Sequence, residues 1–252
     1  MARPDPLAGM VALVTGGSRR IGREICLRLA QDGAAVAVNA RSSRGEVDDT
    51  VRAIESTGGR AMAAMADISN PTANSAMIEA IIATYGRLDI IVHTAVNREH
   101  GSFESLDLDA WRAAQDAVVN GAFLTTKFAA PYLTKQGGAI VYVSGATAFT
   151  GAKGPATPTA KSALVGLMRS VAQSYGAANV RANVLSPGRI EAEDDTPERK
   201  AELARGRPDS QIPLRRPGRP AEIANLVAAM VGPDFSYVTG QVVHATGGYY
   251  MG

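Results

Sequence analysis

The sequence predicts an α/β protein, built as one doubly wound domain with a seven-stranded parallel sheet and helices on both faces. Three observations support this fold class. Short apolar runs rich in β-branched residues alternate along the chain with longer stretches of helical spacing. The runs are apolar throughout rather than at every second position, which is typical of strands covered on both faces. No linker, repeat or change of composition divides the chain, so residues 1–252 are expected to form a single domain.

In the first part of the chain, each stretch of helical spacing ends at a glycine. The helix over Arg20–Gln31, for example, stops before Asp32-Gly33, which is a helix C-terminal signal. The elements predicted up to the fourth strand are, in order, strand Met10–Thr15, helix Arg20–Gln31, strand Ala34–Asn39, helix Gly45–Thr57, the weaker strand Arg60–Ala66, helix Pro71–Tyr85 and strand Leu88–His93.

The second part continues the alternation, with one interruption. Its predicted elements are the long helical stretch Leu108–Gln136, strand Ala139–Ser144, helix Lys161–Tyr175, strand Val180–Leu185, helix Ala221–Val231 and strand Gln241–Ala245. The charged, proline-bearing segment 189–220 breaks the rhythm after the sixth strand. Loops at the carboxyl ends of parallel strands form the ligand crevice, so this segment is interpreted as a mobile substrate lid, with a solvated excursion as the alternative.

A glycine-rich turn, TGGSRRIG over residues 15–22, joins the first strand to the first helix. Glycines let backbone N–H groups and the positive end of a helix approach a pyrophosphate closely. The turn lies between a strand and a helix near the start of the chain, which is the context this motif requires. The sequence therefore predicts a Rossmann-type dinucleotide site, with these residues of the turn as ligands: Gly16, Ser18, Arg19, Arg20 and Ile21.

The end of the second strand indicates which dinucleotide is bound. NAD-binding proteins usually carry an acidic residue there for the ribose hydroxyls, whereas this chain has Arg41 and Ser42 after Asn39-Ala40. Arg41, with Arg19 or Arg20, can hold a 2′-phosphate through charge-assisted hydrogen bonds. NADP(H) is therefore the expected cofactor, and ordinary solvated arginines are the alternative.

The composition of the chain limits the partners, the location and the metal sites that can be expected. The chain has 26 Lys and Arg against 24 Asp and Glu, which gives no argument for nucleic acid or an anionic membrane as a partner. No run reaches the roughly 20 apolar residues that span a bilayer, and no signal peptide is recognised, so a cytoplasmic protein with a small-molecule substrate is expected. The single cysteine, Cys26, is expected to be a buried hydrophobe. The three histidines lack metal-ligand spacing, and no metal site is expected.

These motifs resemble the short-chain dehydrogenase/reductase family over nearly the whole chain, in particular its 3-oxoacyl-ACP reductase-like and pteridine reductase-like members. The family turn TGxxxGIG reads TGGSRRIG here, with Arg20 in place of the middle glycine, as in the NADPH-dependent pteridine reductase branch. The resemblance implies further cofactor contacts from Asp67, Ile68, Ala95, Lys161, Pro187, Gly188 and Ile190. The family segment NNAG reads His93-Thr94-Ala95-Val96, which adds bulk beside the cofactor.

The resemblance also implies a catalytic set of Asn, Ser, Tyr and Lys. Carried over by motif, Asn120, Ser144 and Lys161 match three of these, with Gly145 as the alternative to Ser144. The tyrosine position, four residues before the lysine, is Thr157. An aliphatic hydroxyl is a far weaker acid than a phenol, so Thr157 is either an atypical catalytic group or, with Pro158, the N-cap and first-turn pair of a helix.

Two functions from different classes fit this pattern. The first is an NADPH-dependent reductase of a small carbonyl, activated double bond or imine, whose proton comes from Ser144, from a water near Lys161 or from His100. The second is a catalytically degenerate NADP-binding homologue that acts as a sensor or partner subunit, and catalysis without net redox is a third possibility.

The family resemblance implies a homotetramer, with a dimer as the alternative. The close subunit packing is expected to use small residues of the two long helices, namely Ala113, Ala114, Gly121, Ala122, Ala163 and Gly166.

Overall fold

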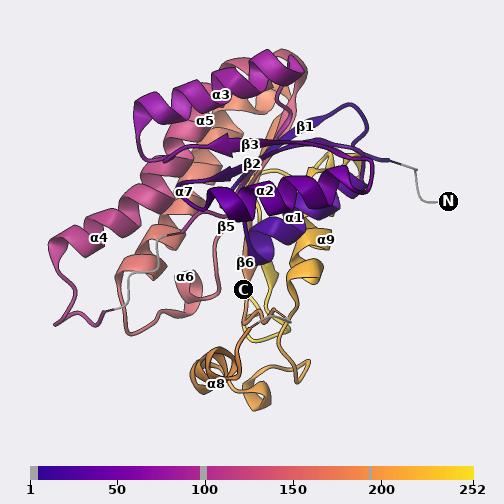
Figure 1. The fold of residues 1–252 in the computed structure, drawn as a ribbon. Coiled ribbons are helices and arrows are strands. Elements are labelled where there is room, and N and C mark those ends of the chain that lie inside the picture. The colour runs from indigo at the N-terminus through magenta and orange to yellow at the C-terminus, as the bar shows by residue number, and fades with distance from the viewer. Residues whose placement is uncertain (1–4, 97–100, 193–194) are drawn as a thin grey trace.

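A computed structural model describes residues 5–96, 101–192 and 195–252 and shows a seven-stranded parallel sheet between two layers of helices (Figure 1). The strand order is β3-β2-β1-β4-β5-β6-β7. The strands are β1 Val11–Thr15, β2 Ala35–Ala40, β3 Arg60–Met65, β4 Ile90–His93, β5 Gly138–Val143, β6 Val180–Pro187 and β7 Val242–Ala245. The predicted fold class is thus confirmed. Strand β1 pairs with both β2 and β4, so the chain reverses its direction of winding there, where open α/β sheets bind ligands.

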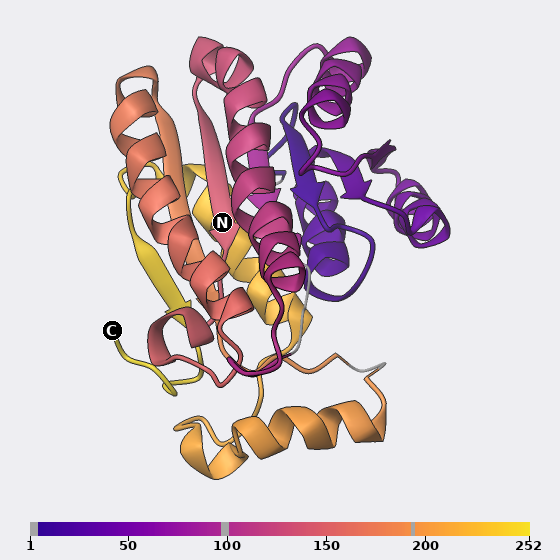
Figure 2. The same cartoon turned by 90° about the vertical axis from the view of Figure 1, so that its left-hand side faces the viewer.

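Two hydrophobic cores lie on the two faces of the sheet. Helices α1 (Arg20–Gln31), α2 (Arg44–Glu55) and α9 (Pro220–Val231) cover one face. Helices α3 (Pro71–Tyr85), α5 (Gly121–Gln136) and α7 (Ala156–Tyr175) cover the other (Figure 2). In β1, Val11 and Leu13 belong to the second core while Ala12 and Val14 belong to the first. This two-sided burial explains why the strands read as continuous apolar runs.

The long helical stretch predicted over Leu108–Gln136 is interrupted. It consists of α4 (Leu108–Gln115), a π-helical turn η1 (Asp116–Asn120) and α5. A π turn inserts extra residues into the helix and so rotates the residues on its two sides relative to one another. The α-helical pattern therefore assigns residues near this turn to the wrong face, and Asn120 is one of these residues.

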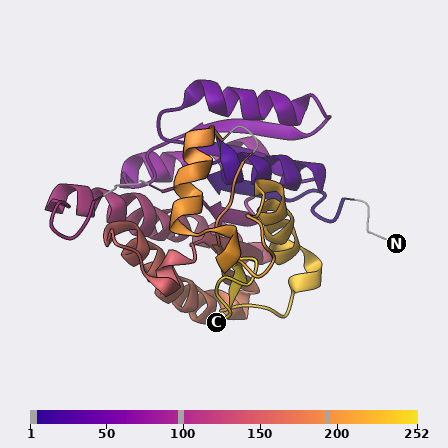
Figure 3. The same cartoon turned by 90° about the horizontal axis from the view of Figure 1, so that it is seen from below.

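The segment 189–220 contains a helix that the sequence analysis missed, α8 (Pro197–Gly206). Thr196 caps it by accepting a hydrogen bond from the N–H of Arg199, and Pro197 occupies the first turn. Seen from below, α8 lies across the carboxyl edge of the sheet (Figure 3). A bridge between Ile190 and Gly218 ties the two ends of the segment together.

Shorter elements complete the described chain. They are helix α6 (Thr147–Thr150) and the 3₁₀ turns η2 (Gly176–Ala178), η3 (Asp209–Gln211) and η4 (Pro233–Phe235). Within the described ranges, no helix combines the length and the apolar character needed to cross a membrane.

Candidate dinucleotide and active site

A large cleft of about 1670 Å³ opens at the carboxyl edge of the sheet, between the strand ends and residues 189–220, the segment that we call the lid for its expected role. Every residue predicted to contact the cofactor lines it: Gly16, Ser18, Arg19, Arg20, Ile21, Arg41, Ser42, Asp67, Ile68, Ala95, Lys161, Pro187, Gly188 and Ile190. Ser144, Gly145 and Thr157 line the same cleft, whereas Asn120 does not. Residues scattered over 175 positions are thus brought to one site by the parallel strands.

The glycines of the turn are required by its packing. Gly16 has a φ of +69°, in the region that favours glycine. A Cβ on Gly22 would overlap the carbonyl oxygen of Gly16, and a Cβ on Gly17 would lie 2.8 Å from the Cys26 Sγ. Arg20 holds a positive φ of +51° without being glycine. The first helix therefore approaches the turn so closely that only hydrogen fits at Gly22.

Cys26, which packs against this turn, is fully buried as expected. Burial raises the pKa of its thiol far above the usual value, while its backbone hydrogen bond and Arg23 oppose the shift weakly. The side chain therefore acts as a small hydrophobe.

The turn can receive an anion because its helix lacks a side-chain cap. Arg19 is the N-cap residue of α1 and makes no side-chain hydrogen bond to the first turn. The N–H groups at this helix end carry a partial positive charge toward the cleft. Ser18 is held by the neighbouring helix, since its Oγ donates to Glu46 at 3.0 Å and its carbonyl accepts from Thr50. These features fit a pyrophosphate at the turn.

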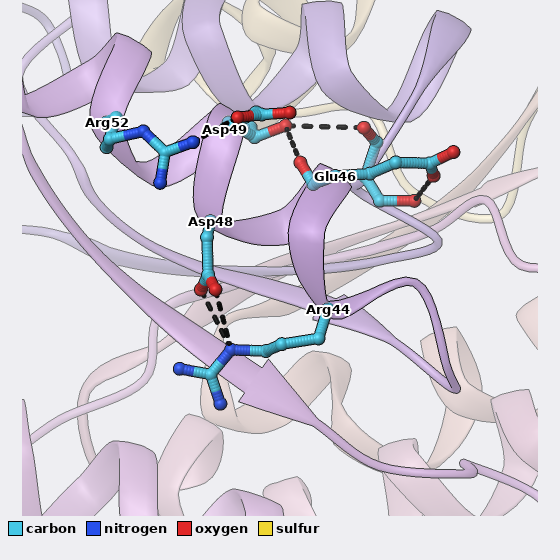
Figure 4. A network of polar contacts seen from close by, with 7 residues as sticks. Arg44, Glu46, Asp48, Asp49 and Arg52 are labelled. Atoms are coloured by element: carbon cyan, nitrogen blue, oxygen red, sulfur yellow. Dashed lines mark hydrogen bonds and ion pairs between the residues drawn. The ribbon is translucent and has the colours of Figure 1, made fainter.

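The arginines near the second strand differ in their partners. In α2, Arg44 donates through Nε to both oxygens of Asp48, at 2.8 and 3.0 Å, and Arg52 pairs with Asp49 (Figure 4). Arg19 and Arg41 line the cleft without a carboxylate partner among the described residues. These two guanidinium groups are therefore available to an anion in the cleft.

Arg20 differs from Arg19 and Arg41, because its side chain forms an ion pair with a residue of the lid. Its guanidinium pairs with Asp195, which also lies 3.2 Å from Arg199 and accepts from the N–H of Ala192 at 2.8 Å. Burial alone would raise the pKa of Asp195, but hydrogen bonds from Arg20 and Ala192 and the charges of both arginines hold it below its usual value. The ionised carboxylate thus fastens the start of the lid to the phosphate-binding turn.

Lys161 and Ser144 form a buried pair at the end of β5. The Lys161 Nζ donates to the carbonyl of Val143 at 2.7 Å, and the Ser144 Oγ donates to the backbone carbonyl of Lys161 at 3.0 Å. The Ser144 hydroxyl is therefore committed to the α7 backbone. At Gly145, an added Cβ would meet nothing closer than the Thr147 Oγ1 at 3.9 Å, so this position faces open space in the cleft.

The structure corrects the capping interpretation of Thr157. Helix α7 begins at Ala156 with Pro155 as its N-cap residue, so Thr157 and Pro158 already lie inside the helix. Thr157 lines the cleft one turn before Lys161. Its side chain is thus a group of the cleft, not a helix cap.

Asn120 lies apart from the other candidate catalytic residues. It is exposed at the end of the π turn, and its amide donates to Asp116 at 2.6 Å. Ala113, Asp116 and Ala117 line the cleft from this stretch instead. Sequence reasoning missed them because the phase of the helix changes at the π turn.

His93 is the last residue of β4 and is buried against the ring of Tyr142, with centroids 5.1 Å apart and planes 6° apart. Its Nδ1 lies 3.4 Å from the Thr15 Oγ1. Burial, with a smaller contribution from the Lys161 cation, lowers the pKa of His93 to about 3. The imidazole is therefore neutral near pH 7 and supplies no proton. His100, the histidine that the sequence analysis considered as a proton donor, lies outside the described residues.

A pH dependence of stability follows from His93. In the unfolded chain His93 binds a proton near pH 6.5, whereas in the folded chain it stays neutral down to about pH 3. The free energy of unfolding should therefore fall as the pH drops below about 6.5. Urea unfolding between about pH 7.5 and 5 should show this loss in the wild type and a shallower loss in His93→Asn. Identical slopes for the two proteins would contradict the assignment.

The comparisons with known proteins agree with this geometry. A family model described as enoyl-(acyl carrier protein) reductase matches residues 16–250. The chain is 36% identical over 255 residues to an uncharacterized oxidoreductase of Methylorubrum extorquens, covering 96% of this chain and 98% of that protein. It is 32% identical over 242 residues to the 3-oxoacyl-[acyl-carrier-protein] reductase FabG of Staphylococcus aureus, covering 95% and 98%. A solved blue fluorescent protein from a metagenomic library in complex with NADPH superposes with a TM-score of 0.89 at 32% identity, covering 98% and 100%. Each likeness spans the turn, the strand ends and the lid.

Proposed function

Because this chain belongs to the short-chain dehydrogenase/reductase family and is an oxidoreductase of that type, we propose that it uses NADPH to reduce a small carbonyl compound or an activated C=C or C=N bond. One observation carries the proposal. A single cleft gathers the glycine-rich turn, two arginines without carboxylate partners and a buried lysine. A dinucleotide with a 2′-phosphate fits this combination of donors.

The choice of NADPH over NADH rests on the arginines. Arg41 stands where NAD-binding proteins usually carry a carboxylate, and Arg19 lines the cleft from the neighbouring turn. The structural relative in complex with NADPH supports the same choice. In this proposal Arg19 and Arg41 hold the 2′-phosphate, while Arg20 fastens the turn to the lid.

The chain's own residues define what the site does. When bound, the nicotinamide supplies the hydride for the reduction. Lys161 places a fixed cation at the reacting end of the cleft, where it holds the cofactor ribose and stabilises negative charge that develops on a substrate oxygen or nitrogen. Pro187, Gly188 and Ile190 line the cleft at and just after the end of β6, where they would border the nicotinamide.

The proton donor is the atypical part of this site. Thr157 is too weak an acid, and the Ser144 hydroxyl is occupied by the Lys161 carbonyl. We therefore favour a water beside Lys161, whose acidity the neighbouring cation increases. A substrate that needs little protonation, such as an activated double bond or an iminium, suits this arrangement best.

The second candidate is a degenerate NADP-binding subunit that acts as a sensor or as the partner of an active paralogue. Gly145 and Thr157 favour this second function. Both line the cleft with Lys161, but glycine has no side chain and the threonine hydroxyl is too weak an acid to donate a proton. The two functions differ in how the cleft responds when an acid is restored.

A homotetramer, with a dimer as the alternative, and a cytoplasmic location remain parts of the proposal. We expect the subunits to pair through α7 rather than through both long helices. Ala114, Gly121 and Ala122 are buried inside the subunit, so they do not form the contact, whereas Ala163 and Gly166 are exposed on α7.

Titration with NADPH and NADH tests the proposed cofactor. The wild type should bind NADPH at least about tenfold more tightly than NADH, since a charge-assisted hydrogen bond contributes roughly 1.5–3 kcal/mol. Arg41→Gln should weaken NADPH binding by about 10- to 100-fold and leave NADH binding unchanged. The matched control is Arg52→Gln, on the same side of the sheet but paired with Asp49, which should change neither. Equal losses for both cofactors in Arg41→Gln, or no binding by the wild type, would contradict the proposal.

A further inference from the structure

A second group of cations lines the cleft far from the phosphate-binding turn. It consists of Lys153 between α6 and α7, Arg205 at the end of α8 and Arg207 just after α8, together with Tyr249 from the chain after β7. We call these four residues the lid cation cluster. Within the described chain, none of its three cations is paired with a carboxylate. Their neighbours in the lid, by contrast, are paired: Arg199 with Asp195, and Arg189 with Glu191 and Asp209.

Arg207 is held in place on both sides. Its guanidinium carbon lies 4.9 Å from the centroid of the Tyr249 ring, a cation–π arrangement. Its backbone carbonyl accepts a hydrogen bond from the guanidinium of Arg189, which is itself buried and ion-paired. The half-buried Arg207 is therefore a positioned group of the cleft wall, with its charge uncompensated by any described carboxylate.

The dinucleotide phosphates cannot serve this cluster. Arg41 follows β2, whereas Tyr249 follows β7, and five strand intervals separate these strands in the sheet. At about 4.8 Å per interval, Arg41 and Tyr249 stand on the order of 24 Å apart across the cleft. The phosphates of the cofactor belong with the turn and Arg41, so Arg207 beside Tyr249 is left available to a different anion. Glu202 of α8 also lines the cleft, but it makes no ion pair with Lys153, Arg205 or Arg207.

We infer that the lid cation cluster binds an anionic group of the substrate, a carboxylate or a phosphate, so that the enzyme reduces a small anionic compound. The guanidinium of Arg207 and the hydroxyl of Tyr249 can both donate hydrogen bonds, which matches the several acceptor oxygens of such a group. The inference rests on the proposed function, because the proposed function assigns the opposite end of the cleft to NADPH.

Calorimetry on the protein saturated with NADP⁺ tests the inference with three probes: hexanoate, hexyl phosphate and the neutral hexanamide. At least one anionic probe should bind, and at least about tenfold more tightly than hexanamide. Arg207→Gln should weaken that binding by about 10- to 100-fold, and Arg205→Gln, at an exposed position, should weaken it less. Arg215→Gln is the matched control, because Arg215 belongs to the same segment but does not line the cleft. Equal binding of amide and anions, or unchanged anion binding in both Arg207→Gln and Arg205→Gln, would overturn the inference.

The NADP⁺ titration of the same samples separates the two proposals. Arg207→Gln should bind NADP⁺ like the wild type, so a loss confined to the anionic probe belongs to the lid cation cluster. Should the wild type not bind NADP⁺, the proposed function fails, and the probes are titrated into the protein alone. A loss of anion binding in Arg207→Gln then still supports the cluster, whereas a loss only in Arg41→Gln places the anion at the turn and overturns it.

Discussion

Replacing Thr157 by tyrosine is expected to raise the rate of NADPH-dependent carbonyl reduction by about 10²- to 10⁴-fold, the usual contribution of a positioned general acid. Thr157 lines the cleft four residues before Lys161 on α7, so the two side chains share one face of the helix. A phenol at this position would lie beside the Lys161 cation, which lowers the pKa of a neighbouring acid. The measurement is the rate of NADPH oxidation with a panel of small carbonyl compounds.

The control for Thr157→Tyr is Thr159→Tyr, two residues further along the same helix. Thr159 is exposed and does not line the cleft, so this variant adds the same phenol without placing it at the site. Adding Gly145→Ser to Thr157→Tyr should increase the rate further, because Gly145 has open space for a hydroxyl that faces the cleft. If neither Thr157→Tyr nor its combination with Gly145→Ser raised the rate, the cleft would be remodelled, and the degenerate NADP-binding subunit would be favoured.

The dinucleotide half of the cleft could be predicted from sequence because its determinants are local. The turn from Gly16 to Gly22 is continuous in the chain, and Arg41 directly follows a strand whose end must lie beside that turn in a parallel sheet. The strands themselves could be recognised because burial on both faces leaves them no polar positions. These predictions need no knowledge of how distant side chains pair.

The other half of the cleft depends on long-range contacts and on a change of helical phase. Asn120 fits the family motif by its neighbours, yet the π turn at Asp116–Asn120 directs it to solvent. Helix α8 has no buried residue and little apolar pattern, and the segment before it is fastened by Asp195 to Arg20, 175 positions away. Nothing local indicates this ion pair. The lid cation cluster likewise joins residues from three separate segments, so its position could only come from the structure.

Substituting alanine for Gly22 is expected to have the largest effect on cofactor binding. The added methyl group would overlap the carbonyl oxygen of Gly16, a backbone atom that cannot move without changing the turn. Overpacking of this kind costs about 1–3 kcal/mol of stability. Because the displaced turn would lose at least one charge-assisted contact to the pyrophosphate, and others would weaken with it, NADPH affinity should fall by about 10²-fold or more.

The matched variant for Gly22→Ala is Gly45→Ala, in the first turn of α2, where an added Cβ meets nothing within 4 Å. This change should leave NADPH binding intact and stabilise the protein by up to about 1 kcal/mol, since alanine is the better helix residue. Thermal unfolding measures the stability of both variants, and NADPH titration measures their affinity for the cofactor. If Gly22→Ala bound NADPH like the wild type, the close approach of α1 to the turn would not be what forms the site. A loss confined to Gly22→Ala would instead show that the dinucleotide is recognised by backbone geometry that only glycine allows.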